Sequence, residues 1–184
     1  MKVVLVRHGE PDYSGVRARK FIGHGNDLAS LTSQGKEQAQ NAAENPALDG
    51  VELIVSSPYT RALQTAAIIS RHRNIPIEVE LDLHEWLPDL QHTFSTEEFV
   101  KEAARLLDLN KGTCPADSPI KYEELSNIFD RASKVLNRYT GYDKIAVVAH
   151  GMLLLQFSPL RSIGYCGISE IEYDKDFKWC GWVE

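Results

Sequence analysis

Hydrophobic residues along this 184-residue chain fall into short, β-branched runs separated by longer stretches with helical spacing. Proline at position 76 lies in one of the short runs, and proline cannot donate a ladder hydrogen bond, so that run is expected at an edge of a sheet. The runs typical of buried strands cover residues 2–7, 51–55, 75–79 and 145–149.

Apolar side chains recur at helical spacing between these strands. One helix is predicted over residues 32–45 with Thr32 as its N-cap. A second is predicted to open at Pro58, where the missing N–H of proline costs nothing. The capping-box spacing of Ser95-Thr-Glu-Glu98 predicts a third helix, and a fourth is predicted over residues 122–139.

The last part of the chain has a different pattern. Two short runs, residues 168–173 and 177–183, flank Asp174-Lys-Asp176 and are typical of a hairpin. Strand–helix alternation elsewhere favours a parallel sheet with helices on both faces. The predicted fold is therefore α/β: a three-layer α/β/α sandwich, mostly parallel, with a C-terminal antiparallel hairpin. Neither a linker nor a repeat interrupts residues 1–184, so a single domain is expected.

Composition narrows the class of protein. The hydrophobic fraction of 43% and charged fraction of 25% are ordinary for a globular protein. A net charge of −6 gives no basic footprint for nucleic acid, and no apolar run reaches a membrane span. The N-terminus enters a strand at once without a small-residue cleavage site, so no signal peptide is expected. Three cysteines without a CxxC pattern (Cys114, Cys166 and Cys180) predict a reduced, cytoplasmic protein.

Two of the predicted strands end in His-Gly. His8-Gly9 follows the first strand, directly after Arg7, and His150-Gly151 follows the last parallel strand. Parallel strands bring their carboxyl ends to one edge of the sheet, where α/β folds bind ligands. The two imidazoles are therefore expected to share a crevice. If only one of these His-Gly pairs were present, a structural histidine at a strand end, bonded only to backbone, would be the simpler interpretation.

Arg61 is placed in the first turn of the helix that follows the second strand. A cation is unfavourable there because the helix N-terminus is already positive. A bound anion resolves the conflict, since free N–H groups and a guanidinium can both point at it. The alternative is an arginine that turns into solvent.

Glu85 lies among large apolar residues just after the third strand. Such surroundings raise a carboxyl pKa towards the range useful for acid catalysis, although a glutamate at the rim of the fold would have an ordinary one. Two arginines, two histidines and this carboxyl are suited to phosphoryl transfer to nitrogen, because one imidazole can attack phosphorus while the cations hold its oxygens.

With these residues the chain resembles the histidine phosphatase superfamily, in particular the branch that includes phosphoglycerate mutases and many small phosphatases. Five motifs occur in the family's order: Arg7-His-Gly-Glu10, Leu31-Thr-x-x-Gly35-x-x-Gln-Ala39, Ser56-Ser-Pro-x-x-Arg61-Ala-x-x-Thr-Ala66, Leu83-x-Glu85 and Val148-Ala-His-Gly151. The resemblance covers most of the chain and implies a phosphoglycerate mutase-like fold.

The resemblance also implies a role for each residue. His8 would be the nucleophile and pass through a phosphohistidine. Arg7, Arg61 and His150 would bind the phosphoryl group, and Glu85 would protonate the leaving alkoxide and then activate water. No metal or other cofactor is expected, because arginines and an imidazole supply the positive charge that magnesium supplies elsewhere.

The candidate substrate-binding residues are Ser14, Gly151 and His24. Ser14 stands where many family members have asparagine, and its hydroxyl can still donate to phosphate. His24 belongs to a segment that replaces the usual tryptophan-containing loop, and a lone loop histidine is more often solvated. Trp86 is equally compatible with the substrate pocket and with core packing.

These observations predict a small-molecule phosphomonoesterase, because the short segment between Glu85 and the Ser95 capping box favours an open pocket and hydrolysis. The alternatives are a mutase-type phosphotransfer, an α-ribazole-phosphate phosphatase, and an inactive phosphoanion-binding module. A metal-binding protein is the weakest interpretation, since the six histidines show no ligand spacing. The edge of the final hairpin could support a homodimer. Neither a nucleic-acid nor a membrane partner is expected.

Overall fold

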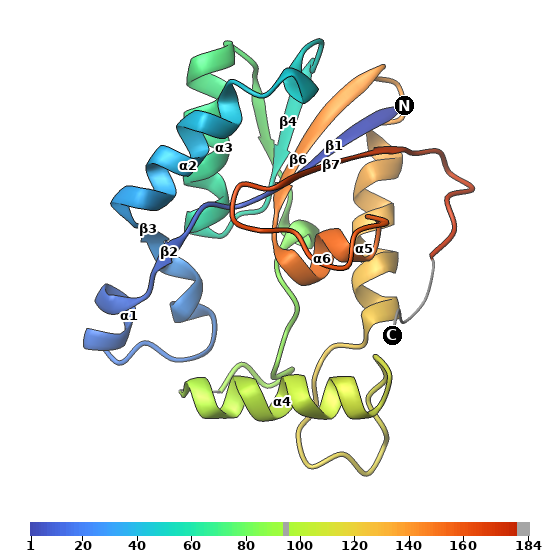
Figure 1. Cartoon of the computed structure of the whole chain (residues 1–184). Helices are drawn as coiled ribbons and strands as arrows, with labels where there is room; N and C mark the ends of the chain where they lie inside the picture. Colours follow the sequence, from blue (N-terminus) through green and yellow to red (C-terminus); the bar gives the residue numbers. More distant parts are fainter. Residues whose placement is uncertain (94–95, 180–184) are drawn as a thin grey trace.

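The computed structural model describes residues 1–93 and 96–179 of the chain. A twisted five-stranded sheet with the order β5-β4-β6-β1-β7 forms its centre (Figure 1). β1 pairs in parallel with β6, β6 with β4 and β4 with β5, whereas β7 is antiparallel to β1. The strands are β1 (Lys2–Arg7), β4 (Leu53–Ser56), β5 (Ile77–Val79), β6 (Lys144–Ala149) and β7 (Ile168–Glu172).

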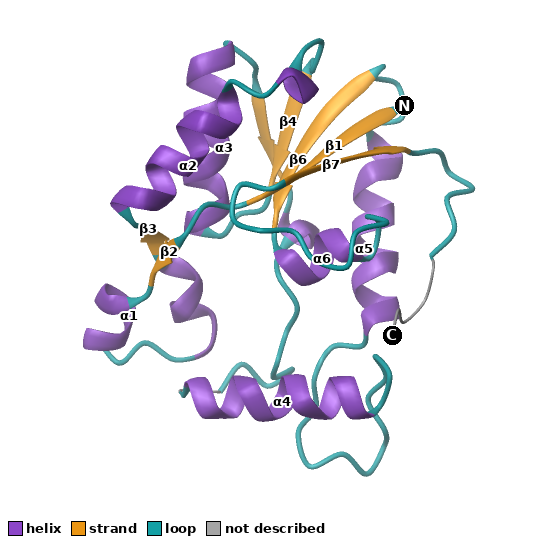
Figure 2. Ribbon diagram, in the orientation of Figure 1, coloured by secondary structure: helices purple, strands orange, loops and turns teal. Residues whose placement is uncertain are grey.

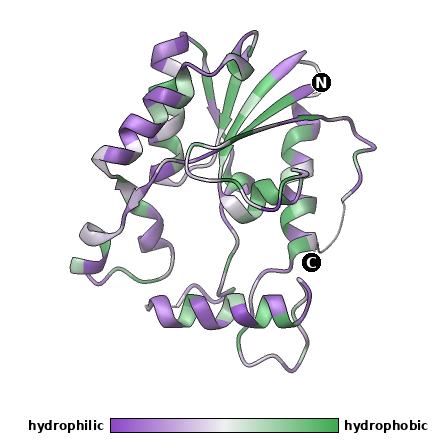
Figure 3. Ribbon diagram, in the orientation of Figure 1, coloured by the Kyte–Doolittle hydropathy of each residue, from purple (hydrophilic) through white to green (hydrophobic). Residues whose placement is uncertain are grey.

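Helices cover both faces of this sheet, as Figure 2 shows. On one face Val4 and Val6 pack with buried residues of α2 (Ser33–Ala43) and α3 (Thr60–Arg73). On the other face Val3 and Leu5 belong to a cluster with residues of α5 (Leu125–Arg138) and α6 (Gly151–Leu155), which extends to α4 (Glu97–Leu109). Alternate residues of β1 thus enter two separate cores, which accounts for its unbroken apolar run. In Figure 3 the hydrophobic colour is concentrated in the strands and on one face of each long helix. The predicted three-layer architecture is confirmed.

The remaining elements lie mainly around the carboxyl ends of the parallel strands (Figure 1). A two-stranded sheet and two short helical segments follow β1, and none of these was predicted. The bounds are β2 (Pro11–Asp12), α1 (Ser14–Ala18), η1 (Gly23–Leu28), β3 (Ser30–Leu31), η2 (Pro46–Leu48), η3 (Leu81–Leu83), α4 (Glu97–Leu109), α5 (Leu125–Arg138) and α6 (Gly151–Leu155).

The predicted helix starts are partly confirmed. Thr32 caps α2, with its hydroxyl oxygen accepting from the Gly35 N–H at 2.8 Å. Helix α3 begins at Thr60 after the N-cap Tyr59, so Pro58 precedes the helix instead of opening it. The N-cap of α4 is Thr96, whose side chain accepts from the Phe99 N–H, while Ser95 lies outside the described residues. Helix α5 begins three residues later than predicted, at Leu125.

The C-terminal hairpin needs correction. β7 forms and supplies the antiparallel pairing, but residues 177–179 are loop, and residues 180–183 lie outside the described part. Phe177 and Trp179 pack their rings against Phe129 at centroid distances of 6.4 and 6.2 Å, and Trp179 Nε1 donates to Gln156 Oε1 at 3.0 Å. Their apolar character therefore reflects packing against helices and not pairing in a sheet.

None of the helices in the described ranges combines the length and apolar character needed to cross a membrane. Nor do those ranges hold a group of three or more His, Cys, Asp or Glu side chains placed to bind a metal ion.

Candidate active site

The parallel pairing of β1 and β6 brings the two His-Gly segments together. Arg7 lies opposite Ala149 in the strand register, so the next residues, His8 and His150, leave the sheet side by side. Their ring centroids are 5.1 Å apart, and the His8 N–H donates to the Ala149 carbonyl at 3.0 Å. Both histidines are buried. The shared crevice expected from the sequence is therefore present.

The hydrogen bonds of His8 assign its tautomer. Nδ1 lies 2.7 Å from the Gly9 carbonyl, which can only accept, so Nδ1 carries the proton. Nε2 accepts from Arg61 Nε at 3.2 Å and therefore holds a lone pair. Burial, followed by the charge of Arg61, lowers the pKa of His8 from 6.5 to about 3. The imidazole is neutral at physiological pH, as a nitrogen nucleophile must be.

Gly9 is required by close backbone packing. A Cβ at this position would lie 2.4 Å from the Gly35 carbonyl oxygen, closer than any side chain tolerates. The Gly9 N–H also donates to Thr65 Oγ1 at 3.0 Å, and that hydroxyl donates to the Arg61 carbonyl. The turn after His8 is thus tied directly to the first turns of α3.

Arg61 is buried at the start of α3 and does not turn into solvent. Its Nε faces His8, its Nη1 donates to Asp27 Oδ1 at 3.1 Å, and its guanidinium lies 5.1 Å from the centre of the Tyr59 ring. Asp27 and Tyr59 were not predicted as site residues. Asp27 acts across a long loop and Tyr59 is a single aromatic, so neither carries a local sequence signal.

Arg7 and His150 leave two polar atoms without partners beside His8. Arg7 donates from Nη1 to the Ile163 carbonyl at 2.7 Å and stacks 4.5 Å from the Tyr165 ring centre. His150 Nε2 lies 2.8 Å from Ser57 Oγ. Among the described residues, three buried side-chain nitrogen or oxygen atoms lack a hydrogen-bond partner, and two of these are Arg7 Nε and His150 Nδ1. Such groups are costly unless a ligand satisfies them.

Gly151 lies directly against Arg7. A Cβ added at this glycine would approach Arg7 Nε to 3.5 Å, on the side where the guanidinium nitrogen is unpartnered. Burial lowers the pKa of His150 well below its ordinary value, so this histidine is neutral too. Either atom of the Ser57–His150 pair can be the donor; the tautomer in which the Ser57 hydroxyl donates to Nε2 leaves the Nδ1–H of His150 available to an oxyanion.

Glu85 faces the cavity from the loop after η3. Its carboxylate accepts from the N–H groups of Trp86 at 2.9 Å and of Met152 and Leu153 at 3.3 Å. Burial nevertheless raises the pKa of Glu85 above its ordinary value, because desolvation outweighs these bonds. A carboxyl with a raised pKa can carry a proton closer to neutral pH.

A buried ion pair holds the loop that carries Glu85. Arg131 Nε donates to Glu123 Oε1 at 2.7 Å, and other guanidinium nitrogens of Arg131 donate to the carbonyls of Asp82 and Glu85. Trp86 Nε1 donates to the Glu123 carbonyl at 2.7 Å. Trp86 is buried and also lines the cavity, so it has both of the roles considered from the sequence.

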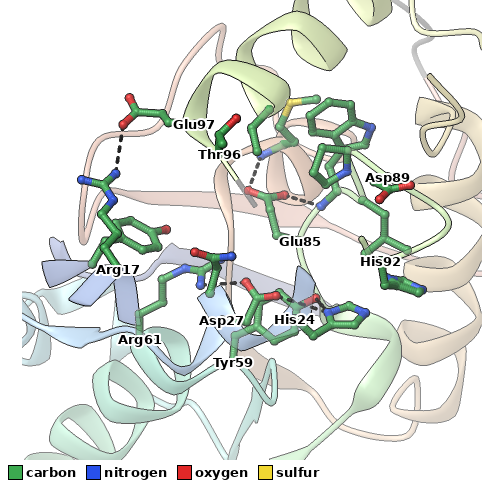
Figure 4. Close-up of a pocket in the computed structure, with 17 residues that line it drawn as sticks. Arg17, His24, Asp27, Tyr59, Arg61, Glu85, Asp89, His92, Thr96 and Glu97 are labelled. Atoms are coloured by element: carbon green, nitrogen blue, oxygen red, sulfur yellow. Dashed lines mark hydrogen bonds and ion pairs between the residues drawn. The ribbon is translucent and has the colours of Figure 1, made fainter. Parts of the chain in front are cut away.

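The cavity above the site has a volume of about 420 Å³. Arg61 and Glu85 both line it, and Figure 4 shows the Glu85 carboxylate bonded to backbone nitrogen atoms on the side of the cavity away from Arg61. The other lining residues come from α1, η1, α4 and α6, from the start of α3 and from the loop after η3: Tyr13, Arg17, His24, Asn26, Asp27, Tyr59, Trp86, Leu87, Pro88, Asp89, His92, Thr96, Glu97, Val100 and Met152.

The two remaining candidates are placed differently. His24 lines the cavity, where its Nδ1 lies 3.3 Å from Asp27 Oδ2 and 3.1 Å from the Tyr59 hydroxyl. Its ring centroid is 4.3 Å from that of His92. Ser14 is exposed, its N–H donates to Asp12 Oδ1, and it borders a different surface depression. The structure does not bring Ser14 to the cavity of Arg61 and Glu85.

Comparison with known proteins gives the family of this chain. The family profile described as histidine phosphatase superfamily (branch 1) matches residues 3–180. The chain belongs to the histidine phosphatase superfamily. The enzyme class predicted from the sequence, a phosphatase, is the class of this family.

Two curated relatives of this superfamily member cover nearly its whole length. It is 29% identical to a probable phosphoglycerate mutase, GpmB, of Proteus mirabilis, covering 100% of this chain and 90% of the relative. It is 28% identical to an uncharacterized phosphatase, PhoE, of Bacillus subtilis, covering 96% and 90% respectively.

Solved structures confirm the fold. A mycobacterial glucosyl-3-phosphoglycerate phosphatase superposes with a TM-score of 0.71 at 23% identity, covering 93% of this chain and 89% of that one. The alpha-ribazole phosphatase of Shigella flexneri superposes with a TM-score of 0.68 at 20% identity, covering 96% and 93%.

Proposed function

We propose that this protein is a metal-independent phosphomonoesterase that hydrolyses a small phosphorylated metabolite through a phosphohistidine on His8. The observation that carries the proposal is the arrangement around His8 Nε2. The neutral Nε2 accepts a hydrogen bond from the Arg61 guanidinium, and two buried nitrogen atoms, Arg7 Nε and His150 Nδ1, have no protein partner. A phosphoryl group would satisfy these donors.

In the first step Nε2 of His8 attacks phosphorus and the bond between phosphorus and the alcohol oxygen breaks. Arg7 and Arg61 neutralise charge on the phosphoryl oxygens and the neutral His150 donates a hydrogen bond to them, and these side chains are held in place before the substrate arrives. The Gly9 carbonyl accepts from Nδ1 and supports the positive charge that develops on the ring.

Glu85 supplies the proton for the leaving group. An alkoxide leaves poorly at neutral pH, so transfer of the Glu85 proton to that oxygen accompanies cleavage. The resulting carboxylate then takes a proton from water, whose oxygen attacks phosphorus while the bond to Nε2 breaks. Inorganic phosphate and the neutral imidazole result, and Glu85 is protonated again.

Hydrolysis is preferred over mutase chemistry because the segment between Glu85 and the Ser95 capping box is short, which favours access of water. Sustained phosphate release from para-nitrophenyl phosphate in the presence of EDTA is the expected result. Strict dependence on a metal ion, or no release from any member of a monoester panel, would contradict the proposal.

A mutase remains the second candidate because one curated relative is a probable phosphoglycerate mutase. A coupled isomerisation assay run beside the phosphate assay separates the two activities. The same panel should include α-ribazole phosphate and glucosyl-3-phosphoglycerate, the compounds named for two structural neighbours. An inactive phosphoanion-binding module would bind phosphate without releasing any from these esters.

A further inference from the structure

Outside the proposed phosphoryl site, the cavity has one further arginine. Arg61 and Arg17 are the arginines among its described lining residues, and no lysine lines it. Arg61 is engaged with His8 and Asp27. Arg17 extends from α1 at the opposite end of the cavity from His24 and His92, as Figure 4 shows.

Arg17 is held by contacts that a ligand can replace. Its guanidinium lies 5.5 Å from the Tyr13 ring centre, and Nη2 donates to Glu97 Oε2 at 3.0 Å. The two charged side chains remain 60% and 52% exposed, so their pairing contributes little free energy. Glu97 Oε1 also pairs with Lys101 at 3.0 Å, so this carboxylate keeps a cation when Arg17 leaves it.

The other carboxylates of the cavity are committed elsewhere. Asp27 holds Arg61, and Glu85 accepts three backbone N–H bonds. Asp89 accepts from the N–H groups of Gln91 and Thr93. In the described cavity wall, the Arg17–Glu97 ion pair is therefore the contact that a ligand can replace. Arg17 would then bind the ligand, and Glu97 would keep its ion pair with Lys101.

We propose that Arg17 determines substrate specificity by binding a carboxylate on the alcohol part of the substrate, in place of Glu97. This proposal rests on the phosphomonoesterase function and narrows its substrate class to phosphate esters of acidic alcohols. The phosphate occupies the site of Arg7, Arg61 and His150, and the carboxylate reaches along the cavity to α1. Glu97 competes for the same guanidinium and limits the affinity for such substrates.

The test uses binding, which does not depend on turnover. Phosphonopropionate, phosphonobutyrate and phosphonopentanoate are titrated by calorimetry against alkylphosphonates of the same chain length, which lack the carboxylate. Ligands of several chain lengths are used because the phosphonate and the carboxylate must together span from the phosphoryl site to Arg17. The wild-type protein is expected to favour the carboxylate ligand by about twofold to fivefold at its best length, the range for an exposed ion pair.

Variants test whether Arg17 is responsible for the preference for the carboxylate ligand. Arg17→Gln is expected to reduce the ratio to about one, and Glu97→Gln to increase it above the wild-type value, because the competitor is gone. Arg19→Gln is the matched control, since Arg19 is an exposed arginine of the same segment that borders a different depression. It should keep the wild-type ratio.

The outcomes separate the two proposals. A wild-type ratio of one at every length, or an unchanged ratio in Arg17→Gln, overturns the role of Arg17. Failure of the wild type to bind either series overturns both the role and the phosphoryl site. A clear preference without phosphate release from any monoester supports Arg17 and overturns the phosphatase function alone.

Discussion

Arg61 Nε donates a hydrogen bond to His8 Nε2 across 3.2 Å, so the proposed phosphate clamp and the proposed nucleophile are in contact before any substrate binds. The arginine favours the neutral imidazole through its charge, and it occupies the side of the ring from which phosphorus must be attacked. Binding of a phosphoryl group therefore has to exchange this bond for bonds to phosphate oxygens.

The clearest prediction for the proposed acid concerns the leaving group. Glu85→Gln should lower kcat/KM for an alkyl ester such as glycerol phosphate by about a hundredfold to a thousandfold, because the alkoxide needs a proton. The loss for para-nitrophenyl phosphate should be below about tenfold, because nitrophenolate leaves unprotonated. Steady-state kinetics with both esters measure the difference. Equal losses for the two would show that Glu85 is not the acid.

A second prediction is that phosphate stabilises the folded protein through the unpartnered donors. Inorganic phosphate at about a hundred times its dissociation constant should add about 2.7 kcal/mol and raise Tm by several degrees in a scanning fluorimetry experiment. His150→Ala removes one donor and should reduce the shift at the same phosphate concentration. His72→Ala, on an exposed part of α3, is the control. A full shift in His150→Ala would place the phosphate elsewhere.

The buried state of His8 predicts a dependence of stability on pH. In the unfolded chain His8 binds a proton below its ordinary pKa of 6.5, whereas in the folded protein it does so only near 3. The unfolded state therefore takes up more protons as pH falls, and stability is lost in that window. His8 alone should account for a loss of about 2 kcal/mol between about pH 7 and about pH 5.

Urea unfolding at the two pH values measures this effect. His8→Asn should show a smaller loss than the wild type, although part will remain because burial lowers the pKa of His150 in the same direction. The comparison concerns the change between the two pH values, so a general destabilisation of the variant does not affect it. An identical loss in both proteins would contradict the assignment.

Asp27 is predicted to position Arg61. Asp27→Ala removes the acceptor for Arg61 Nη1 and should lower kcat/KM for para-nitrophenyl phosphate by about tenfold. Asp27→Asn keeps an oxygen acceptor and should recover most of that loss. The inhibition constant of inorganic phosphate, measured for both variants, reports whether the guanidinium still binds the anion. A loss in Asp27→Asn as large as in Asp27→Ala would indicate that the charge, and not the position, matters.

The sequence was sufficient for the parts of the site that local patterns encode. His8, Arg61 and His150 each follow a buried strand, and parallel pairing then requires them to meet. Glu85 was found from its apolar neighbours and from the order of the motifs. The helix cap at Thr32 followed from one side chain and one turn. In each case the information lies within a few residues.

The parts that were missed depend on contacts between distant segments. Asp27 reaches Arg61 only because β2 and β3 fold the loop after β1 back over α3. The Glu123–Arg131 pair that anchors the Glu85 loop comes from the segment leading into α5 and from that helix. Alternation alone predicts a strand for the C-terminal aromatics, because it cannot show whether these side chains meet a sheet partner or a helix face.

The sheet order also sets the sequence of events during synthesis. The neighbours of β1 in the sheet are β6 and β7, which both belong to the last quarter of the described chain. A growing polypeptide therefore displays the strand that carries His8 without a ladder partner until β6 has left the ribosome. Pairing between strands so far apart in the sequence is slow. The yield of active protein should therefore depend on the presence of chaperones. A chain interrupted before β6 would contain the proposed nucleophile and its arginines and still lack His150 and the sheet partner of β1.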